Sequence, residues 1–310
     1  MNSQEISFFH RVLFLWYRKQ GRHDLPWRKT DDLYAITVSE IMLQQTNVPK
    51  VIEKYQLFLE RFPDWFSLSR ASQSSVVHAW EGLGYNRRAL YLHKMAKVVC
   101  DDFGGELPEN PDVLKKMPGM GPYTRHAVLV FGRNRDFLAL DVNLIRVFGR
   151  WLGGRDVSVH GEEITYRLMR GSLKKHVQDL SLFLPRGKSR KFHNAMMDFA
   201  SLICTKRRPK CFACPLKNVC QSYPVPFELK HVKKKEPGRM EQGKFVPRRI
   251  FRGRIVSVLR SGSSGVSVIG KKIKRDWQVS ADSVWLEDLL ARLVKDGVVE
   301  KVGRKWQLVE

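Results

Sequence analysis

Four of the chain's five cysteines lie in one short basic segment, where their thiols could bind a metal or form disulfides. They are Cys204, Cys211, Cys214 and Cys220, with six, two and five residues between them. A zinc ribbon usually offers two separate C-x2-C pairs, and only Cys211 and Cys214 form such a pair. A [4Fe–4S] cluster is larger and takes one thiolate per iron, which suits four cysteines around a short loop. The spacing therefore favours an iron–sulfur cluster, with zinc or ordinary thiols as the alternatives.

The chain is strongly basic, which indicates a polyanionic partner. Its 310 residues include 55 Lys and Arg against 31 Asp and Glu, for a net charge of +24 and a pI near 10.1. We expect nucleic acid rather than a membrane, because no apolar run approaches the ~20 residues of a spanning helix. The first residues lack the features of a signal peptide, so we expect a reducing compartment: the cytoplasm around the nucleoid, or the nucleus in a eukaryote. Disulfides are rare there, which argues against them at the four cysteines.

A glycine-rich turn before a helix is a second candidate binding site. Gly119 and Gly121 flank Met120, and Pro122 opens an apolar run that predicts a helix. The glycines allow a tight turn and a close backbone approach, and proline suits the first helical position. Free amides at this helix start would face an anion such as a DNA phosphate. The alternative is a plain corner between two helices.

The elements that position these motifs are predicted to be mainly helical. Residues 5–222 show successive amphipathic helices, with no convincing alternating strand pattern before about residue 250. Residues 224–248 are rich in proline and charge, which is typical of a linker. Residues 249–310 predict helices followed by a hairpin around Gly303, the pattern of a small α/β winged-helix-like domain that binds DNA.

The order of glycine hairpin, aspartate and four-cysteine loop resembles the helix-hairpin-helix, or endonuclease III-like, superfamily of DNA glycosylases, over residues 8 to about 223. The resemblance implies a two-lobed, mainly α domain over residues 1–223, with a structural [4Fe–4S] loop at 204–220. It implies a monomer of base excision repair that binds double-stranded DNA with a mismatched or damaged base. In such a protein Gly119, Gly121 and the loop's basic residues would bind the DNA backbone; the latter are Lys206, Arg207 and Arg208.

Tyr123 stands where the endonuclease III branch carries a lysine, directly after the hairpin. A lysine amine there attacks the sugar and forms a Schiff base, which leads to strand cleavage. Tyrosine cannot form an imine. We therefore expect a monofunctional glycosylase that uses water.

Further segments resemble the adenine DNA glycosylases that act on A/G mismatches. They read LPWR (25–28), VSEIMLQQT (38–46), WEGLGYNRRALYLHK (80–94) and FHNAMMDFASLICT (192–205). By this resemblance Glu40 is the general acid that protonates the departing base, and Asp141 stabilises the positive charge that develops on the sugar. The pocket-lining residues would be Tyr123 and Asn143, and the residues that probe the duplex around the extruded base would be Gln45 and Tyr85.

The sequence around the two carboxyls fits these roles. Glycosidic cleavage passes through an oxocarbenium-like state, so it needs a proton donor and a fixed anion near the sugar. Glu40 lies among apolar residues, which would raise its pKa and keep a proton available. Asp141 precedes a predicted helix, whose positive end would favour the ionised form. Without the motifs, the alternatives are a solvated helix residue for Glu40 and a simple N-cap for Asp141.

Three departures from the adenine glycosylases leave the excised base open. Val142 replaces a usual glycine, and Arg125 and His126 stand where small residues are usual. The C-terminal segment is also too short for the nudix-like domain that recognises 8-oxoguanine. We expect adenine opposite guanine or 8-oxoguanine. The alternative is a thymine/uracil glycosylase acting on G:T and G:U mismatches, and a less favoured one is a DNA-binding redox regulator.

Overall fold

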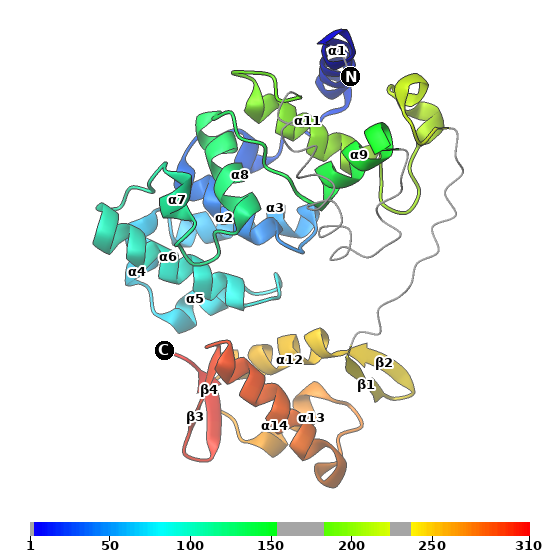
Figure 1. Cartoon of the computed structure of the whole chain (residues 1–310). Helices are drawn as coiled ribbons and strands as arrows, with labels where there is room; N and C mark the ends of the chain where they lie inside the picture. The colour runs from blue at the N-terminus through cyan, green and yellow to red at the C-terminus, as the bar shows by residue number, and fades with distance from the viewer. Residues whose placement is uncertain (1–2, 154–182, 224–236) are drawn as a thin grey trace. The chain divides into compact units, whose positions relative to one another are not determined.

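The computed structural model describes residues 3–153, 183–223 and 237–310, most of which are helical, as predicted (Figure 1). The chain divides into two compact units. Unit 1 consists of Met1–Ile36 and Met120–Lys233, and unit 2 of Thr37–Gly119 and Lys234–Glu310. Much of the expected linker, residues 224–236, lies outside the described residues. None of the helices described is long and apolar enough to cross a membrane.

Unit 1 is held together by an aromatic core. Its helices are α1 (Ser3–Gln20), α8 (Pro122–Arg133), α9 (Val142–Gly153) and α11 (Ser189–Leu202), with 3₁₀ helices at Pro26–Arg28, Cys211–Ala213 and Lys217–Val219. Phe9 of α1 stacks on Trp151 of α9, with ring centroids 4.0 Å apart, and Phe192 of α11 packs edge-on against Phe9. Buried aromatic rings contribute much of the apolar area of such a core. The core thereby fixes α9, which follows Asp141, and α11, which leads into the cysteine loop.

A buried carboxylate ties α11 to the segment after α1. Asp198 is fully buried and accepts hydrogen bonds from Arg22 Nε at 2.7 Å and from Arg28 Nη1 at 2.8 Å. The backbone N–H of Arg22 donates to the same carboxylate at 2.8 Å. Burial opposes the charge of Asp198, but the hydrogen bonds and charge of Arg28, together with Arg22, lower its pKa below the ordinary value.

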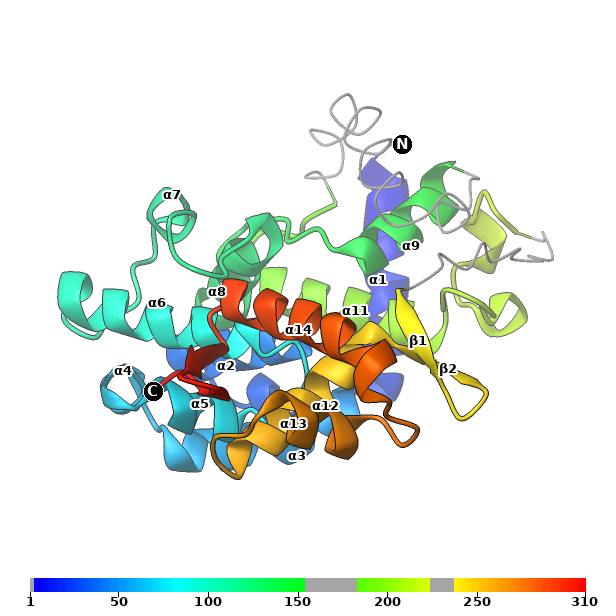
Figure 2. The ribbon, with the colours of Figure 1, turned by 90° about the horizontal axis from the view of Figure 1, so that it is seen from below.

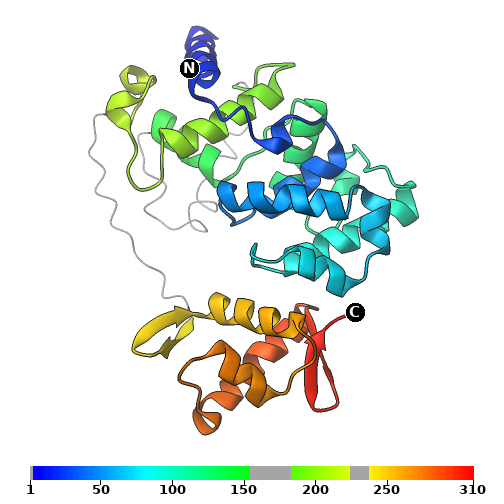
Figure 3. The same ribbon diagram turned by 180° about the vertical axis from the view of Figure 1, so that it is seen from behind.

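Unit 2 begins within α2 (Leu33–Leu43), whose residues 35–42 are all buried. The helices that follow are α3 (Val48–Arg61), α4 (Trp65–Arg70), α5 (Gln73–Ala79), α6 (Arg87–Phe103) and α7 (Pro111–Leu114) (Figure 3). Asn47 caps α3 by accepting from Lys50 N, and a capping box at Asp64 and Ser67 starts α4. The Asn47 cap starts α3 only four residues after α2, the helix that carries Glu40, ends at Leu43.

The C-terminal part of unit 2 has the element order of a winged helix. It contains α12 (Arg248–Arg260), α13 (Val266–Ile273), α14 (Val279–Lys295) and the antiparallel pair β3 (Val299–Val302) and β4 (Lys305–Leu308), gathered on one apolar core (Figure 2). Ser264, between α12 and α13, forms a bridge with Trp306 of β4. The predicted helices and the hairpin around Gly303 are confirmed.

A second hairpin lies where the sequence indicated only a linker. β1 (Gly238–Glu241) and β2 (Lys244–Pro247) pair antiparallel around Gln242 and Gly243. Both turn residues have positive φ, +48° and +74°, as a two-residue hairpin turn requires. β1–β2 and β3–β4 lie at opposite ends of α12 (Figure 1).

The C-terminal helices share a core with the first part of unit 2. Val77 of α5 and Leu90 of α6 join the apolar cluster built by α12, α13 and α14. Arg260 of α12 also donates to Glu81 Oε1 at 2.7 Å and to the carbonyl of Val77 at 3.1 Å.

The buried Asp198 pair yields a stability prediction. Asp198→Asn should lower the free energy of unfolding by about 3–5 kcal/mol at pH 7, because it leaves the guanidinium of Arg28 buried without its anion. A depressed carboxyl pKa contributes stability above the unfolded-state value, ~3.9, and loses it as pH falls through the folded-state value. The gap between wild type and variant, measured by urea unfolding, should therefore close in acid. An equal gap at every pH would contradict the ionised pair.

Candidate functional site

Glu40 lies on α2 in a buried, mostly apolar stretch. Its neighbours Ile36, Val38, Ile41 and Met42 are all buried, and Glu40 itself is only 6% exposed. Glu40 is therefore buried, in a stretch that also contains the buried polar residues Thr37 and Ser39. Glu40 belongs to unit 2 and Asp141 to unit 1.

Asp141 caps the start of α9 through several hydrogen bonds. Its Oδ1 accepts from the backbone N–H groups of Asn143 at 2.9 Å and Leu144 at 2.8 Å, and its Oδ2 accepts from Asn143 Nδ2 at 2.5 Å. The N-cap interpretation of Asp141 is thus confirmed, while its catalytic role stays a prediction. Asn143, predicted to line the base pocket, is a direct hydrogen-bond partner of Asp141.

The electrostatic prediction for Asp141 is wrong in direction. Although Asp141 keeps some surface exposure, protein atoms crowd its carboxyl, and this burial raises its pKa above the ordinary value. Hydrogen bonds from Leu144 and Asn143 and the charge of Arg146 oppose the rise without cancelling it. The helix start does favour the ionised form, but the loss of water outweighs it.

Arg146 joins this carboxyl to the cysteine loop. The arginine is buried on α9 and donates from Nη1 to Asn143 Oδ1 at 3.0 Å. Its Nε donates to the carbonyl of Cys204 at 3.0 Å, and its Nη2 to the carbonyl of Ala200 at 2.9 Å. One guanidinium therefore connects the start of α9, the end of α11 and the first cysteine.

Gly119 has the left-handed backbone of a tight turn, as the sequence predicted. Gly119 has a φ of +81°, and a Cβ there would come within 3.2 Å of Tyr91 Cβ. Gly121 has an ordinary φ of −65°, and no atom lies within 4 Å of the position that a Cβ would take there. Its backbone is therefore accessible at the start of α8. Tyr123 lies in the first turn of α8 and is half-buried.

Gln45 and Tyr85, the predicted duplex probes, are exposed residues with left-handed backbones. Gln45 has a φ of +58° and Tyr85 a φ of +46°, and Tyr85 is 51% exposed. Non-glycine residues adopt this region rarely, and such strain is concentrated at functional sites. Both residues lie in unit 2, Gln45 just after α2 and Tyr85 just before α6.

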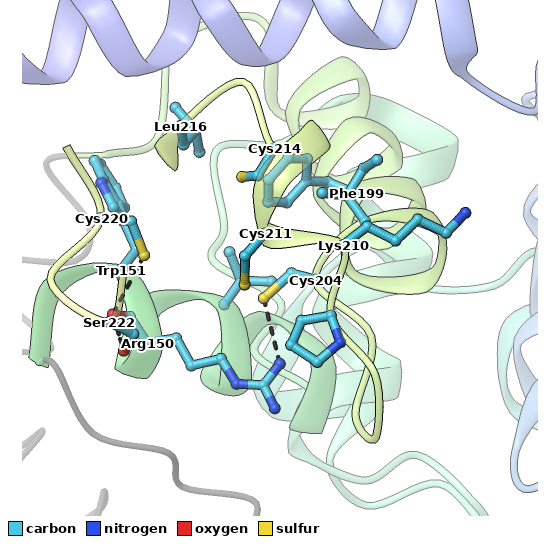
Figure 4. Close-up of a pocket in the computed structure, with 13 residues that line it drawn as sticks. Arg150, Trp151, Phe199, Cys204, Lys210, Cys211, Cys214, Leu216, Cys220 and Ser222 are labelled. Carbon is cyan, nitrogen blue, oxygen red and sulfur yellow. Dashed lines mark hydrogen bonds between the residues drawn. The ribbon is translucent and has the colours of Figure 1, made fainter. Parts of the chain in front are cut away.

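The four cysteines predicted as ligands line one pocket in unit 1 (Figure 4). The pocket encloses about 420 Å³, part of it open to solvent. Apart from Arg150, Lys210 and Ser222, the rest of its lining is apolar: Val147, Trp151, Phe199, Ile203, Pro209 and Leu216. All four thiols are free, so the disulfide alternative receives no support.

Arg150 of α9 reaches into the cysteine loop and holds its first turn (Figure 4). The buried guanidinium donates to the carbonyls of Thr205 at 2.7 Å and Lys206 at 3.0 Å, and to Cys204 Sγ at 3.5 Å. At the other end of the loop, Ser222 Oγ donates to the carbonyl of Arg150 at 2.7 Å. α9 therefore fixes both ends of the segment that carries the cysteines.

The chemistry of these thiols suits a metal group. Burial raises the pKa of Cys214 to about 12, and burial likewise raises the pKa of Cys211 and Cys220. Thiols of this kind stay neutral unless a bound metal replaces the proton and compensates the thiolate charge. Within the described ranges, however, no three Cys, His, Asp or Glu side chains are arranged to hold a metal ion.

The loop's basic residues project beside this pocket. Arg207 and Arg208 are exposed and Lys206 is half-buried. Phe212, between the second and third cysteines, is 84% exposed. The exposed guanidinium groups are therefore available to an anion, as the sequence comparison implied.

Sequence reasoning missed the buried arginines that hold these groups. Arg88, Arg146 and Arg150 are each buried and each donate to backbone carbonyls at a helix end or loop. Arg88 lies within residues 80–94, one of the segments that resemble adenine DNA glycosylases, and this resemblance was the sequence signal that could have identified it. For Arg146 and Arg150, their place in the apolar helix after Asp141 was the only hint.

Known proteins resemble the chain over most of its length. The family model of HhH-GPD superfamily base excision DNA repair proteins matches residues 38–174. The adenine DNA glycosylase of Buchnera aphidicola subsp. Baizongia pistaciae is 37% identical over 215 residues, which cover 69% of this chain and 58% of that protein. The adenine DNA glycosylase of Mycolicibacterium smegmatis is 31% identical over 302 residues, covering 94% of this chain and 92% of that protein.

A solved structure shares the fold. The structure of a thermostable thymine-DNA glycosylase superposes with a TM-score of 0.62 at 29% identity, covering 71% of this chain and 97% of its own. The chain spans only 58% to 65% of the length of the first three curated relatives it matches, all of them adenine DNA glycosylases.

The Arg146 bridge yields a prediction about Asp141. Arg146→Met removes a positive charge that lowers the pKa of Asp141, so that pKa should rise further. A carbon-13 NMR titration of protein labelled at aspartate carboxyls measures it. Arg18→Met, which removes an exposed charge from α1 in the same unit, is the control. Equal Asp141 titrations in the two variants would rule out the bridge as the cause.

Proposed function

This chain belongs to the HhH-GPD superfamily of base excision DNA repair proteins, and from that premise we propose that it is a monofunctional DNA glycosylase. Its substrate is adenine paired with guanine or 8-oxoguanine, and it hydrolyses the N-glycosidic bond. The observation that carries the proposal is the Asp141 turn: a carboxylate fixed by Asn143 and Leu144 at the start of α9. The similarity to adenine DNA glycosylases, 31% identity over 92% of the one from M. smegmatis, supports the choice of base.

The two carboxyls divide the chemistry. Glu40, buried in an apolar stretch, donates a proton to the departing base. Asp141 in its ionised form stabilises the positive charge that develops on the sugar, and water then completes hydrolysis. Asn143 holds Asp141 Oδ2 in place through its amide. Because Tyr123 offers no amine, the product is an abasic site in an intact strand.

The four cysteines hold a [4Fe–4S] cluster in this proposal. They line one pocket, and their spacing in the chain suits a group that takes one thiolate per iron. The cluster supplies a rigid cross-link for the loop and takes no part in the reaction. Arg150 fixes the loop from α9, and Lys206, Arg207 and Arg208 bind phosphates.

The chain acts on double-stranded DNA as a monomer, in the cytoplasm around the nucleoid or in the nucleus of a eukaryote. The net charge of +24 supplies affinity that does not depend on sequence and falls with salt. A thymine/uracil glycosylase for G:T and G:U mismatches is the second candidate, because a thymine-DNA glycosylase shares the fold at 29% identity.

A substrate panel tests the excised base. Duplexes with A:8-oxoG, A:G, T:G and U:G pairs are incubated with purified protein, and abasic sites are revealed by alkali. We expect adenine release from the first two and intact strands before alkali. Release of thymine or uracil would favour the second candidate, and strand breakage with a borohydride-trapped imine would indicate a lyase instead.

The carboxyl variants test the mechanism. Glu40→Gln and Asp141→Asn should each slow single-turnover base release on the order of a hundred- to ten-thousandfold, because each removes an acid or an anion from the transition state. Duplex affinity, measured by fluorescence anisotropy, should stay unchanged. If neither variant alters base release while cluster oxidation releases DNA, the protein is a redox regulator.

Iron analysis tests the cofactor. Anaerobically purified protein should contain about four irons and four acid-labile sulfides per chain. Cys211→Ser should lose most of both, whereas Cys100→Ser, outside the loop, should keep them. Stoichiometric zinc without sulfide would contradict the cluster.

A further inference from the structure

Arg88, on α6, is a buried charge that the proposed chemistry does not use. Arg88 is 7% exposed, and within the part of the chain that the structure describes its hydrogen bonds go to carbonyl and hydroxyl oxygens rather than to carboxylates. Burial lowers its pKa to about 10. A buried cation without an anion is costly unless hydrogen bonds to it are many and well directed. The burial of Arg88 therefore requires compensating hydrogen bonds.

Six oxygen atoms surround its two terminal nitrogens. Nη1 donates to the carbonyls of Ile41 at 2.9 Å, Met42 at 2.8 Å and Gln44 at 2.5 Å, which are at the end of α2 and in the turn after it. These carbonyls are among those that a helix end leaves unpaired. This nitrogen thus holds the segment that leads directly into Gln45.

The other nitrogen holds the second loop. Nη2 donates to the carbonyls of Leu83 and Gly84, each at 3.0 Å, and to Thr46 Oγ1 at 2.9 Å. Thr46 Oγ1 in turn donates to the carbonyl of Leu83 at 3.3 Å. The guanidinium also lies over the ring of Tyr85, 5.7 Å from its centroid. One planar group therefore joins two loops that are about forty residues apart in the chain.

The two loops have the same unusual feature at their tips. Gln45 and Tyr85 are both exposed, and both have the left-handed backbone described above. A strained conformation of this kind persists only where the surrounding contacts over-determine it. The carbonyl immediately before each strained residue, that of Gln44 or of Gly84, accepts a hydrogen bond from Arg88. The same side chain therefore fixes both strained tips.

We infer that Arg88 is a positioning residue that sets the geometry of Gln45 relative to Tyr85, and thereby the efficiency with which the chain extrudes a base from the duplex. The inference rests on the proposed function. Two side chains that fill the space of an extruded base must be held at a fixed spacing, because freedom in either would be lost on binding. Only arginine has a planar fork that reaches carbonyls of two segments at once. Lysine would keep the charge but could not span both.

The test follows base extrusion and base release separately. Duplexes carry 2-aminopurine beside the adenine of an A:8-oxoG pair, and its fluorescence rises when the neighbouring base unstacks. Arg88→Lys should slow single-turnover adenine release on the order of a hundredfold, the cost of a misplaced positioning contact. The fluorescence rise should slow in parallel. Thr46→Val, which removes one of the six acceptors, should slow both by about five- to tenfold.

A mutant cycle separates positioning from general destabilisation. In a Gln45→Ala, Tyr85→Ala background, adding Arg88→Lys should change the release rate by no more than about twofold, because the residues it positions are already gone. The Arg88→Lys defect should also shrink when the adenine faces an abasic gap, since an unpaired base is easier to extrude. Met95→Ala, at a buried α6 position, is the stability control.

Two results would overturn the inference. One is an Arg88→Lys effect that is undiminished in the alanine background or on the abasic-gap duplex. The other is a Met95→Ala variant that lowers the melting temperature as much as Arg88→Lys does and slows base extrusion by the same factor. If the wild type releases no base from any duplex, the proposed function fails, but the fluorescence signal still decides whether Arg88 controls unstacking.

Discussion

The structure depends on buried guanidinium groups that donate hydrogen bonds to backbone carbonyls. Arg88 holds the turn after α2 and the loop before α6, Arg146 joins the Asp141 turn to the end of α11, and Arg150 holds the cysteine loop. An arginine retains its charge when buried, and its fork directs several hydrogen bonds at fixed angles. Each of these groups therefore fixes a helix end or a loop.

The environment of Asp141 follows from this arrangement. Burial raises the pKa of its carboxyl, whereas the Leu144 and Asn143 donors and Arg146 favour the ionised form. A positive charge that develops beside such a carboxylate stabilises its ionised form further, because the hydrogen-bond donors that favour this form are already in place. Preorganised electrostatics of this type need no rearrangement during the reaction. Arg146 donates both to Asn143 Oδ1 and to the carbonyl of Cys204, so one guanidinium links the Asp141 turn to the backbone of the cysteine loop.

Local signals explain what the sequence could predict. The helices follow from apolar periodicity, the left-handed Gly119 from its turn, and the shared pocket of the four cysteines from their spacing. Properties that depend on contacts with residues distant in the chain could not be predicted. The pKa of Asp141 depends on the protein atoms around it, and the acceptors of Arg88 come from residues 41–46 and 83–84. The hairpin at 238–247 was missed because the proline and charged residues around it indicated a linker. The dipeptide Gln242-Gly243, which forms its turn, was the signal that could have indicated the hairpin.

The structure also explains why Val142 is a weak guide to the excised base. Adenine glycosylases usually carry glycine at this position, and Val142 is one of the three departures that left the excised base open. Val142 is 43% exposed at the first position of α9, however, while the Asp141 carboxylate is held by Asn143 and Leu144. A β-branched residue is tolerated in a first helical turn when its side chain points to solvent. The added methyl groups therefore leave the Asp141 hydrogen bonds intact.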